Sequence, residues 1–435
     1  MKAKKLFRMV PAILILISFM LTGGAAKSQP NSKEHEQGMN ILKQALTPAQ
    51  IKVIRDFAKA HRAERRQALE KSLEWDEAIL KALDDFNLSE DQEKKLIEIV
   101  SSRVDLLVPT VEPLMNDGIT LRNAVIADEI DEQEILDLSA QLSADIGQAA
   151  ITVSAMVQEA RQILTPDQLA IIEGLYQKAL AEDQVSPEEM SEQMDEALAF
   201  YQALDIRPEQ IDLLITLGKP LKKMQEERQK REEQRIWRKL GKILTEEQIG
   251  ILKAYIEPRK QEMEEKGPAE EEKALELWYE FGITKDQMDE LVELLAGEKE
   301  DIIATSQATA QASEALRDAV LAQNPDSAKI LEAAGLLGDS IGGAALLAGK
   351  MAAQAKQILT PEQLQLLLSQ LEPGDAEMRT HLSEAPNELQ SLLNLYDQLN
   401  LTPEQKAKLL DWIKADIKKD EKRIKRMLNS PEPGF

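Results

Sequence analysis

The side chains that most often carry catalysis or bind transition metals are scarce in this chain of 435 residues. Its histidines are His35, His61 and His381, which lie at non-equivalent places, and cysteine is absent. Imidazole and thiolate are the usual ligands of zinc, nickel and cobalt, and a cysteine or a base-activated serine is a common nucleophile. A glycine-rich phosphate loop is also missing from the sequence. The sequence therefore predicts no catalytic residue, no metal site and no cofactor.

Carboxylates are abundant, and paired carboxylates could in principle do acid–base chemistry. Pairs such as Glu188-Glu189 and Glu264-Glu265 are instead typical of solvated helix faces. The chain holds 53 Lys and Arg against 77 Asp and Glu, a net charge of −24, and this balance argues against a nucleic-acid partner. Two stretches, 219–242 and 414–426, are nevertheless basic. We expect solvated helix faces there, or helices that pack on an acidic neighbour or bind a shared acidic partner.

Threonine and glutamine recur at a fixed spacing, and their chemistry is hydrogen bonding at helix starts. Eight motifs of the form aliphatic–x–x–x–Gln begin at Leu46, Leu88, Leu164, Ile206, Leu244, Ile283, Leu359 and Leu401. The second residue is most often Thr, whose hydroxyl can cap a helix, and Pro often follows at the first helical position. Gln three residues after the cap can complete a capping box. The candidate helix-cap residues are Leu88, Gln92, Leu164, Thr165, Gln168, Ile283, Thr284, Gln287, Leu359, Thr360 and Gln363.

The motif spacing indicates a tandem duplication. Leu88, Leu164 and Ile206 recur as Ile283, Leu359 and Leu401 at an offset of 195 residues, whereas Leu46 and Leu244 are 198 apart. Other side chains keep the same offset, as Leu121-Arg122 does with Leu316-Arg317. Internal repeats of this kind determine the fold more than any local signal. We therefore predict two helical units of about 195 residues each, 41–240 and 241–435.

The elements that must position these motifs are predicted to be helices throughout. Ile, Leu and Met recur at helical spacing and alternating β-branched runs are absent, so the fold class is all-α. Pro109, Pro113 and the turn signal at residues 116–118 predict a break after the helix that starts at Ser89. A long helix should then run from Asp131 to Ile163, and Asn324-Pro325 marks the equivalent start in the second unit.

The first 26 residues have the pattern of a signal peptide. Lys2, Lys4, Lys5 and Arg8 precede an apolar stretch, and Gly24-Ala25-Ala26 follows it. An uncleaved anchor is the alternative, although the stretch is short for a membrane span. We expect residues 27–40 to form a flexible leader and the protein to be exported to the periplasm without stable membrane insertion.

One further stretch, Ala333–Ala355, consists largely of Ala, Gly, Leu and Met. Glycine is unfavourable inside a helix by about 1 kcal/mol relative to alanine, so close helix approach must compensate. Asp339 and Lys350 argue against a membrane span. The stretch is then either a buried seam or an adaptable apolar surface. On the second interpretation the candidate client surface is formed by Met156, Leu346, Leu347 and Met351.

From Leu88 to about Tyr176, and again from Ile283 to Leu371, the pattern resembles the Spy/CpxP family of periplasmic proteins, also called the LTXXQ family. The motif pairs Leu88–Gln92 with Ile163–Gln168, and Ile283–Gln287 with Ile358–Gln363, carry the likeness. The resemblance implies Spy-like helical hairpin modules at about 85–180 and about 280–372. It also implies an ATP-independent chaperone or envelope-stress adaptor for unfolded or partly folded envelope proteins, acting as a homodimer or an intramolecular pseudo-dimer.

Spy-like cradles are basic on the concave face, whereas the modules here are acidic. Two other functions are consistent with the sequence. Related proteins of the superfamily bind zinc, nickel or cobalt, so a metal-responsive periplasmic sensor is one alternative. A structural helical scaffold for one specific partner is the other.

Overall fold

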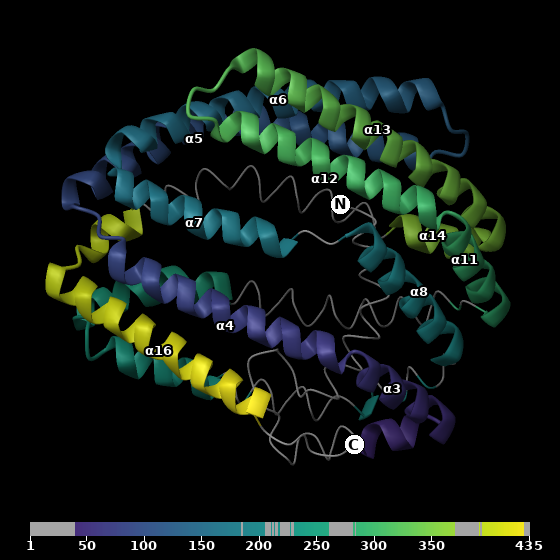
Figure 1. The fold of residues 1–435 in the computed structure, drawn as a ribbon, viewed down its shortest axis with the longest axis horizontal. Helices are drawn as coiled ribbons and strands as arrows, with labels where there is room; N and C mark the ends of the chain where they lie inside the picture. Colours follow the sequence, from purple (N-terminus) through teal and green to yellow (C-terminus); the bar gives the residue numbers. More distant parts are fainter. Residues whose placement is uncertain are drawn as a thin grey trace. The chain divides into compact units, whose positions relative to one another are not determined.

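A computed structural model describes residues 40–183, 186–204, 230–260, 284–369 and 394–429, and a few isolated positions between them. Every regular element in these ranges is an α-helix, as Figure 1 shows, which confirms the all-α fold class. Residues 1–39 lie outside the described residues, and so do most of 205–229 and 261–283. The predicted signal peptide, nearly all of the leader and residues 219–226 of the first basic stretch therefore lie outside the described residues.

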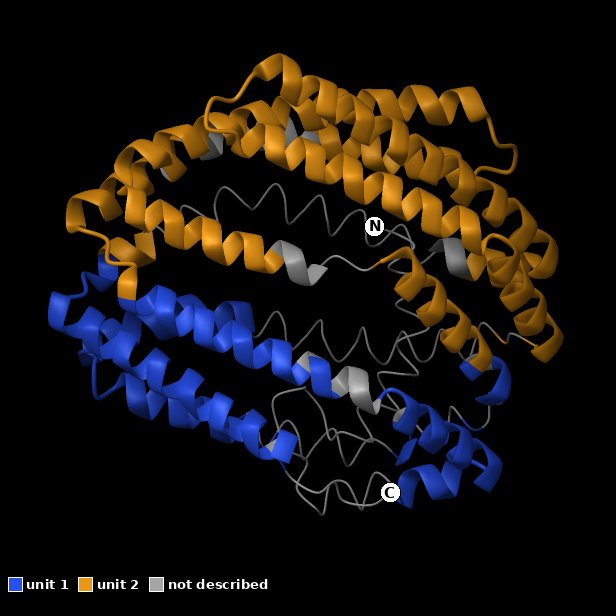
Figure 2. Ribbon diagram, in the orientation of Figure 1, with its two compact units in different colours: residues 1–84, 200–280, 398–435 blue, residues 85–199, 281–397 orange. Residues whose placement is uncertain are grey.

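The helices form two compact units, which Figure 2 shows in different colours. Unit 1 comprises residues 1–84, 200–280 and 398–435, and unit 2 comprises residues 85–199 and 281–397. Each compact unit thus combines segments of both sequence units, 41–240 and 241–435. The helices are α3 (Pro48–Ala60), α4 (Arg62–Asp85), α5 (Glu90–Ile126), α6 (Glu132–Ile163), α7 (Pro166–Asp183), α8 (Pro187–Leu204), α11 (Lys285–Gly297), α12 (Lys299–Leu321), α13 (Ser327–Ile358), α14 (Pro361–Ser369) and α16 (Pro403–Asn429).

The helix starts follow the predicted capping chemistry. Capping boxes join Thr47 to Gln50, Ser89 to Gln92 and Thr284 to Gln287. Asp131 caps α6 as predicted, since its side chain accepts from the backbone N–H groups of the first turn. The start of α13 differs from the prediction by two residues, because the cap is Asp326 and not Asn324.

The predicted break near Pro109 is wrong, because α5 runs without interruption from Glu90 to Ile126. A proline inside a helix removes one backbone donor and costs about 3 kcal/mol. Helix α5 packs extensively along α6, and tertiary packing of this kind overrides local propensity. In the second half the chain breaks instead at Glu298, directly after Gly297, where α11 ends and α12 begins.

The Ala- and Gly-rich stretch is a buried seam in unit 2. Helices α6 and α13 cross so closely that a Cβ atom built on Gly338 would lie 2.2 Å from the Cβ atom of Ser143. The Ser143 hydroxyl donates to the carbonyl of Ala334 across the seam, at 3.0 Å. By length and composition alone α13 could cross a membrane, a criterion that core helices of soluble proteins also meet. Here its small residues pack against α6.

Contacts across this seam come in reciprocal pairs: the two residues of one contact are the 195-residue equivalents of the two residues of another. Leu136 of α6 lies against Gly342 of α13, and Leu331 of α13 lies against Gly147 of α6. Ser143 and Gly338 are themselves 195 residues apart and meet at the crossing point. The two helices are therefore antiparallel and related by a local twofold axis close to this point. Interfaces in which residue i meets j and j meets i have this isologous form.

The same reciprocity extends to the ends of the helices. Lys356 donates through Nζ to the carbonyls of Ile126 and Ala127, at 2.9 and 2.7 Å. Its counterpart Arg161 donates to the carbonyls of Leu321 and Ala322. A cation from one sequence half thus caps the C-terminal carbonyls of a helix from the other half, where it also interacts favourably with the helix dipole.

Unit 1 has its own apolar core and its own charge pairing. Leu42, Ile54, Phe200 and Leu204 are among the buried residues of that core. The basic helix α16 pairs with acidic residues of α4, since Lys414 contacts Asp84 and Lys425 contacts Glu77. The hydrogen bond from Lys414 lowers the pKa of Asp84. For stretch 414–426, part of the charge is therefore used in packing on an acidic neighbour.

Candidate functional site: paired motifs and the α5–α6 groove

The eight motif glutamines form four pairs, each of which joins two helix starts. In unit 2, Gln92 donates to the side-chain oxygen of Gln168 at 2.8 Å, and Gln287 donates to that of Gln363 at 2.8 Å. Both pairs span 76 residues. In unit 1, Gln50 pairs with Gln210 and Gln405 pairs with Gln248, over 160 and 157 residues. Within each sequence half, one pair is therefore nested inside the other.

Each pair is a closed ring of amide hydrogen bonds. Gln168 returns the bond to Gln92, and it also donates to the carbonyl of Asn87 just before the partner motif. Its own side-chain oxygen accepts from the backbone N–H of Thr165, at 2.9 Å. A glutamine amide has two donors and two acceptor lone pairs, and all four are engaged here. Such a fully satisfied buried network fixes the geometry of both helix ends.

The predicted helix-cap residues are placed as follows. Thr165 and Thr360 accept from the backbone N–H groups of Gln168 and Gln363, as a capping box requires. Leu359 is buried, whereas Leu88 and Leu164 are half-buried. Ile283 lies outside the described residues. The sequence interpretation assigned the Gln side chain to a capping box on its own helix and did not include the second helix start that the amide nitrogen contacts.

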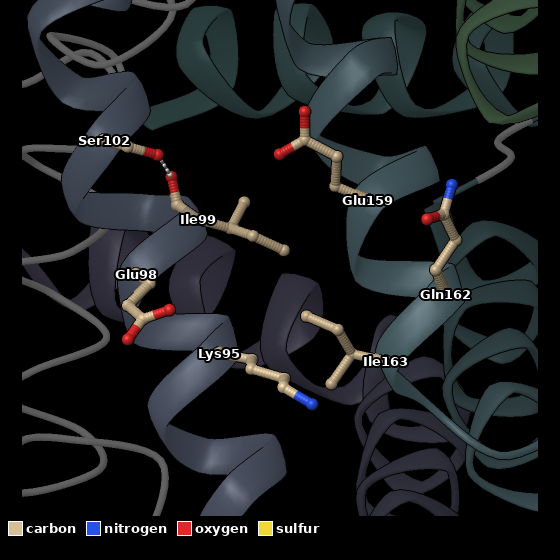
Figure 3. A pocket seen from close by; sticks show the side chains of 7 residues that line it. All are labelled: Lys95, Glu98, Ile99, Ser102, Glu159, Gln162 and Ile163. Atoms are coloured by element: carbon tan, nitrogen blue, oxygen red, sulfur yellow. Dashed lines mark hydrogen bonds between the residues drawn. The ribbon is translucent and has the colours of Figure 1, made fainter.

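An open groove lies beside the Gln92–Gln168 pair, between α5 and α6. It has a volume of about 480 Å³ and is lined by Lys95, Glu98, Ile99, Ser102, Glu159, Gln162 and Ile163. Figure 3 shows the side chains of Ile99 and Ile163 extending into the gap from the two helices, with Glu98 and Glu159 near its rim. The Ser102 hydroxyl donates to the carbonyl of Ile99, so it is held on its own helix.

The rim of the groove is acidic. Lys95 forms an ion pair with Asp91 at 2.7 Å, and its hydrogen bond to Asp91 raises the pKa of the ammonium group. Glu98 and Glu159 contribute two further carboxylates. An apolar floor with a negative rim suits an extended segment that carries an aliphatic side chain beside a Lys or Arg. The groove was not anticipated from the sequence, because its residues come from two helices some 60 positions apart.

The candidate client surface of the sequence interpretation is dispersed on helices α6 and α13. Met156, Leu347 and Met351 are half-buried. Leu346 is also half-buried, and it packs against the core formed by Leu121, Ile135, Leu142 and Ala345. A substitution at Leu346 therefore tests the core as well as any surface function.

In the described ranges, no group of three or more His, Asp and Glu side chains is placed to hold a metal ion. No family model matches the chain, and neither a curated protein nor a solved structure matches it.

Proposed function

We propose that the protein is an ATP-independent periplasmic chaperone, or an envelope-stress adaptor, that binds unfolded or partly folded envelope proteins on a helical surface. The observation that carries this proposal is the open α5–α6 groove, with isoleucines at its floor and carboxylates at its rim. The resemblance to the Spy/CpxP family, the signal-peptide pattern and the helical hairpin modules support it. The groove is open, so it can admit extended segments.

Both modules lie in a single chain, and this suits the proposal. The reciprocal α6–α13 seam joins the module at about 85–180 to the module at about 280–372. An intramolecular pseudo-dimer of this kind needs no second chain to present paired helical surfaces. We therefore expect client capture by the monomer, and the stoichiometry of a complex with a small unfolded client measures it directly.

An aggregation assay tests the proposal. Purified protein is mixed with a reduced or chemically unfolded client in the absence of nucleotide, and light scattering is followed over time. Suppression of scattering at near-stoichiometric amounts is the expected result. Replacing the groove floor with Ile99→Gln should weaken the suppression. Leu294→Gln, at the equivalent half-buried position of the second half, measures separately how much the second module contributes.

A structural scaffold for one specific partner is the second candidate function. The observation in its favour is the set of closed glutamine pairs, which fixes helix ends in both units. A scaffold would leave scattering unchanged for every client and at every salt concentration. That outcome would overturn the chaperone proposal and retain the scaffold.

A further inference from the structure

Two carboxyl groups, one on α5 and one on α6, interact where these helices pack together. Asp117 of α5 is only 8% exposed, and its Oδ1 accepts from the side-chain nitrogen of Gln141 of α6, at 3.1 Å. Its other oxygen, Oδ2, is buried and has no donor among the described residues. The carboxyl group of Asp145, one helical turn beyond Gln141, interacts with Asp117. A buried carboxylate oxygen without a donor is costly, so the arrangement requires an explanation.

The surroundings offer apolar contact and little positive charge. Leu114 and Leu121, one turn away on either side of Asp117, pack in the core of the α5–α6 seam. Burial first, and then the neighbouring Asp145, raise the pKa of Asp117. On α5 the guanidinium of Arg122 donates to Asn123, and on α13 the charged Asp339 and Lys350 are exposed. Of these groups, Asp145 is the one that perturbs Asp117.

We infer that Asp117 and Asp145 share a single proton, and that this proton bridges α5 to α6 at Oδ2 of Asp117. A protonated carboxyl donates one hydrogen bond to its ionised partner, and this bond supplies the donor that the buried oxygen lacks. Loss of the shared proton leaves two neighbouring like charges, one of them on the buried Asp117, and these charges repel each other. The pair is therefore a proton-sensitive lock between the two helices.

The lock belongs to the first sequence half only. At an offset of 195 residues, Ala312 and Ser340 stand where Asp117 and Asp145 stand in the first half. The second half thus has the same helices without the carboxyl pair. Titration of the pair should loosen the α5–α6 seam and leave the equivalent α12–α13 contact unaffected.

The lock lies on the same two helices as the groove. Ile99 and Asp117 are separated by 18 residues of α5, and Asp145 and Ile163 by 18 residues of α6, which is about 27 Å along each helix. If the groove binds clients as proposed, acidity would then regulate the helix pair that forms it. The shared proton itself does not depend on that function, and the experiment below measures it without a client.

The sign of the pH dependence follows from the raised pKa. Between the ordinary Asp value of 3.8 and the raised value, the folded chain binds more protons than the unfolded chain. The stabilisation is therefore fully present at the acidic end and is lost as the pH rises through that window. In Asp117→Asn the neutral amide replaces the carboxyl group, so this part of the pH dependence disappears.

The experiment compares thermal unfolding of the full chain with that of Asp117→Asn and Asp145→Asn, at intervals from about pH 4 to about pH 8. Asp339→Asn, an exposed carboxylate on α13, is the control. As the pH rises, the melting temperature of the wild type should fall by about 2–4 °C more than that of Asp117→Asn or Asp145→Asn. The control should follow the wild type.

Infrared spectroscopy supplies a direct readout that needs no stable variant. Above the ordinary Asp pKa the wild type should retain a protonated-carboxyl band, which Asp117→Asn removes. Absence of that band at every pH above the ordinary value would overturn the inference. So would a melting temperature raised by Ca²⁺ or Mg²⁺ in the wild type but not in Asp117→Asn, because the pair would then hold a cation and not a proton.

Discussion

At the scale of single residues, the glutamine of each motif does more than cap a helix. Its oxygen accepts from the backbone of its own helix start, and its nitrogen reaches a second helix start that lies 76 or about 160 residues away. Gln168 is only 6% exposed, so losing one of its partners leaves a buried polar group unsatisfied. Only an amide can both accept at its own helix start and donate to the second one, since a carboxylate has no N–H group.

Replacing Gln168 with Glu should therefore destabilise unit 2. The carboxylate loses two donated bonds and faces the carbonyl of Asn87 and the oxygen of Gln92. We expect a loss of about 2–4 kcal/mol in the free energy of unfolding, measured by urea titration. Gln148→Glu, on the exposed face of α6, is the control. Equal effects of the two substitutions would contradict a special role for the amide pair.

The capping function of these residues could be predicted from the sequence because it is local, within four residues. The pairing could not, because two helix starts 76 residues apart can meet only if the intervening helices fold back at the right length. One signal was nevertheless present. A capping box uses the glutamine oxygen and leaves both amide N–H groups without a partner, and the spacing of 76 occurs twice.

At the scale of elements, small residues set the short distance between α6 and α13. Gly338 and Gly342 of α13 lie against α6, whereas a Cβ atom built on Gly335 or Gly343 would meet no heavy atom within 4 Å. The sequence indicated a close approach but did not name the partner helix. Prolines 109 and 113 led to a wrong break in α5, since their local cost is outweighed by packing that only the folded structure contains.

The glycines permit a paired test in one helix. Gly338→Ala should destabilise the protein although alanine favours helices, because its Cβ would lie 2.2 Å from that of Ser143. Gly343→Ala meets no neighbour and should stabilise by about 0.5–1 kcal/mol. Thermal unfolding of both variants decides. If the two substitutions change the melting temperature in the same direction, the seam is not closely packed in solution.

The cations that cap neighbouring helices give a second test at this scale. The Lys356 side chain is 16% exposed and donates to two carbonyls at the end of α5. Lys356→Met keeps the aliphatic stem and leaves those carbonyls without the cation, at an expected cost of about 1–2 kcal/mol. Lys350→Met, on the exposed face of the same helix, should change the stability by less than about 0.5 kcal/mol. A similar loss in both variants would argue against the capping function.

At the scale of the whole molecule, the negative charge should select clients. With a net charge of −24 and an acidic groove rim, we expect stronger suppression of aggregation for basic clients than for acidic ones. Raising the salt concentration to 0.15 M shortens the screening length to about 8 Å and should weaken this preference without abolishing capture. Light scattering with two clients of similar size and opposite charge measures it.

A matched pair of variants locates that preference. Glu98→Gln combined with Glu159→Gln should reduce the advantage of the basic client, because both residues line the groove. Glu293→Gln, at the position equivalent to Glu98, should leave the advantage unchanged. An unaltered preference in the double variant would place the client elsewhere on the protein.

The seam between α6 and α13 also limits the order in which parts of the chain can fold. Ser143 meets its partner Ala334 only after 191 further residues, and Ile126 waits for Lys356, which follows 230 residues later. Contacts so remote in sequence form slowly, and none can form before the second half has been synthesised. A newly made first half therefore presents the small-residue face of α6 without its partner helix. Until α13 is available, α6 lacks its closest packing partner, and pulsed hydrogen exchange during refolding should show α6 and α13 gaining protection together.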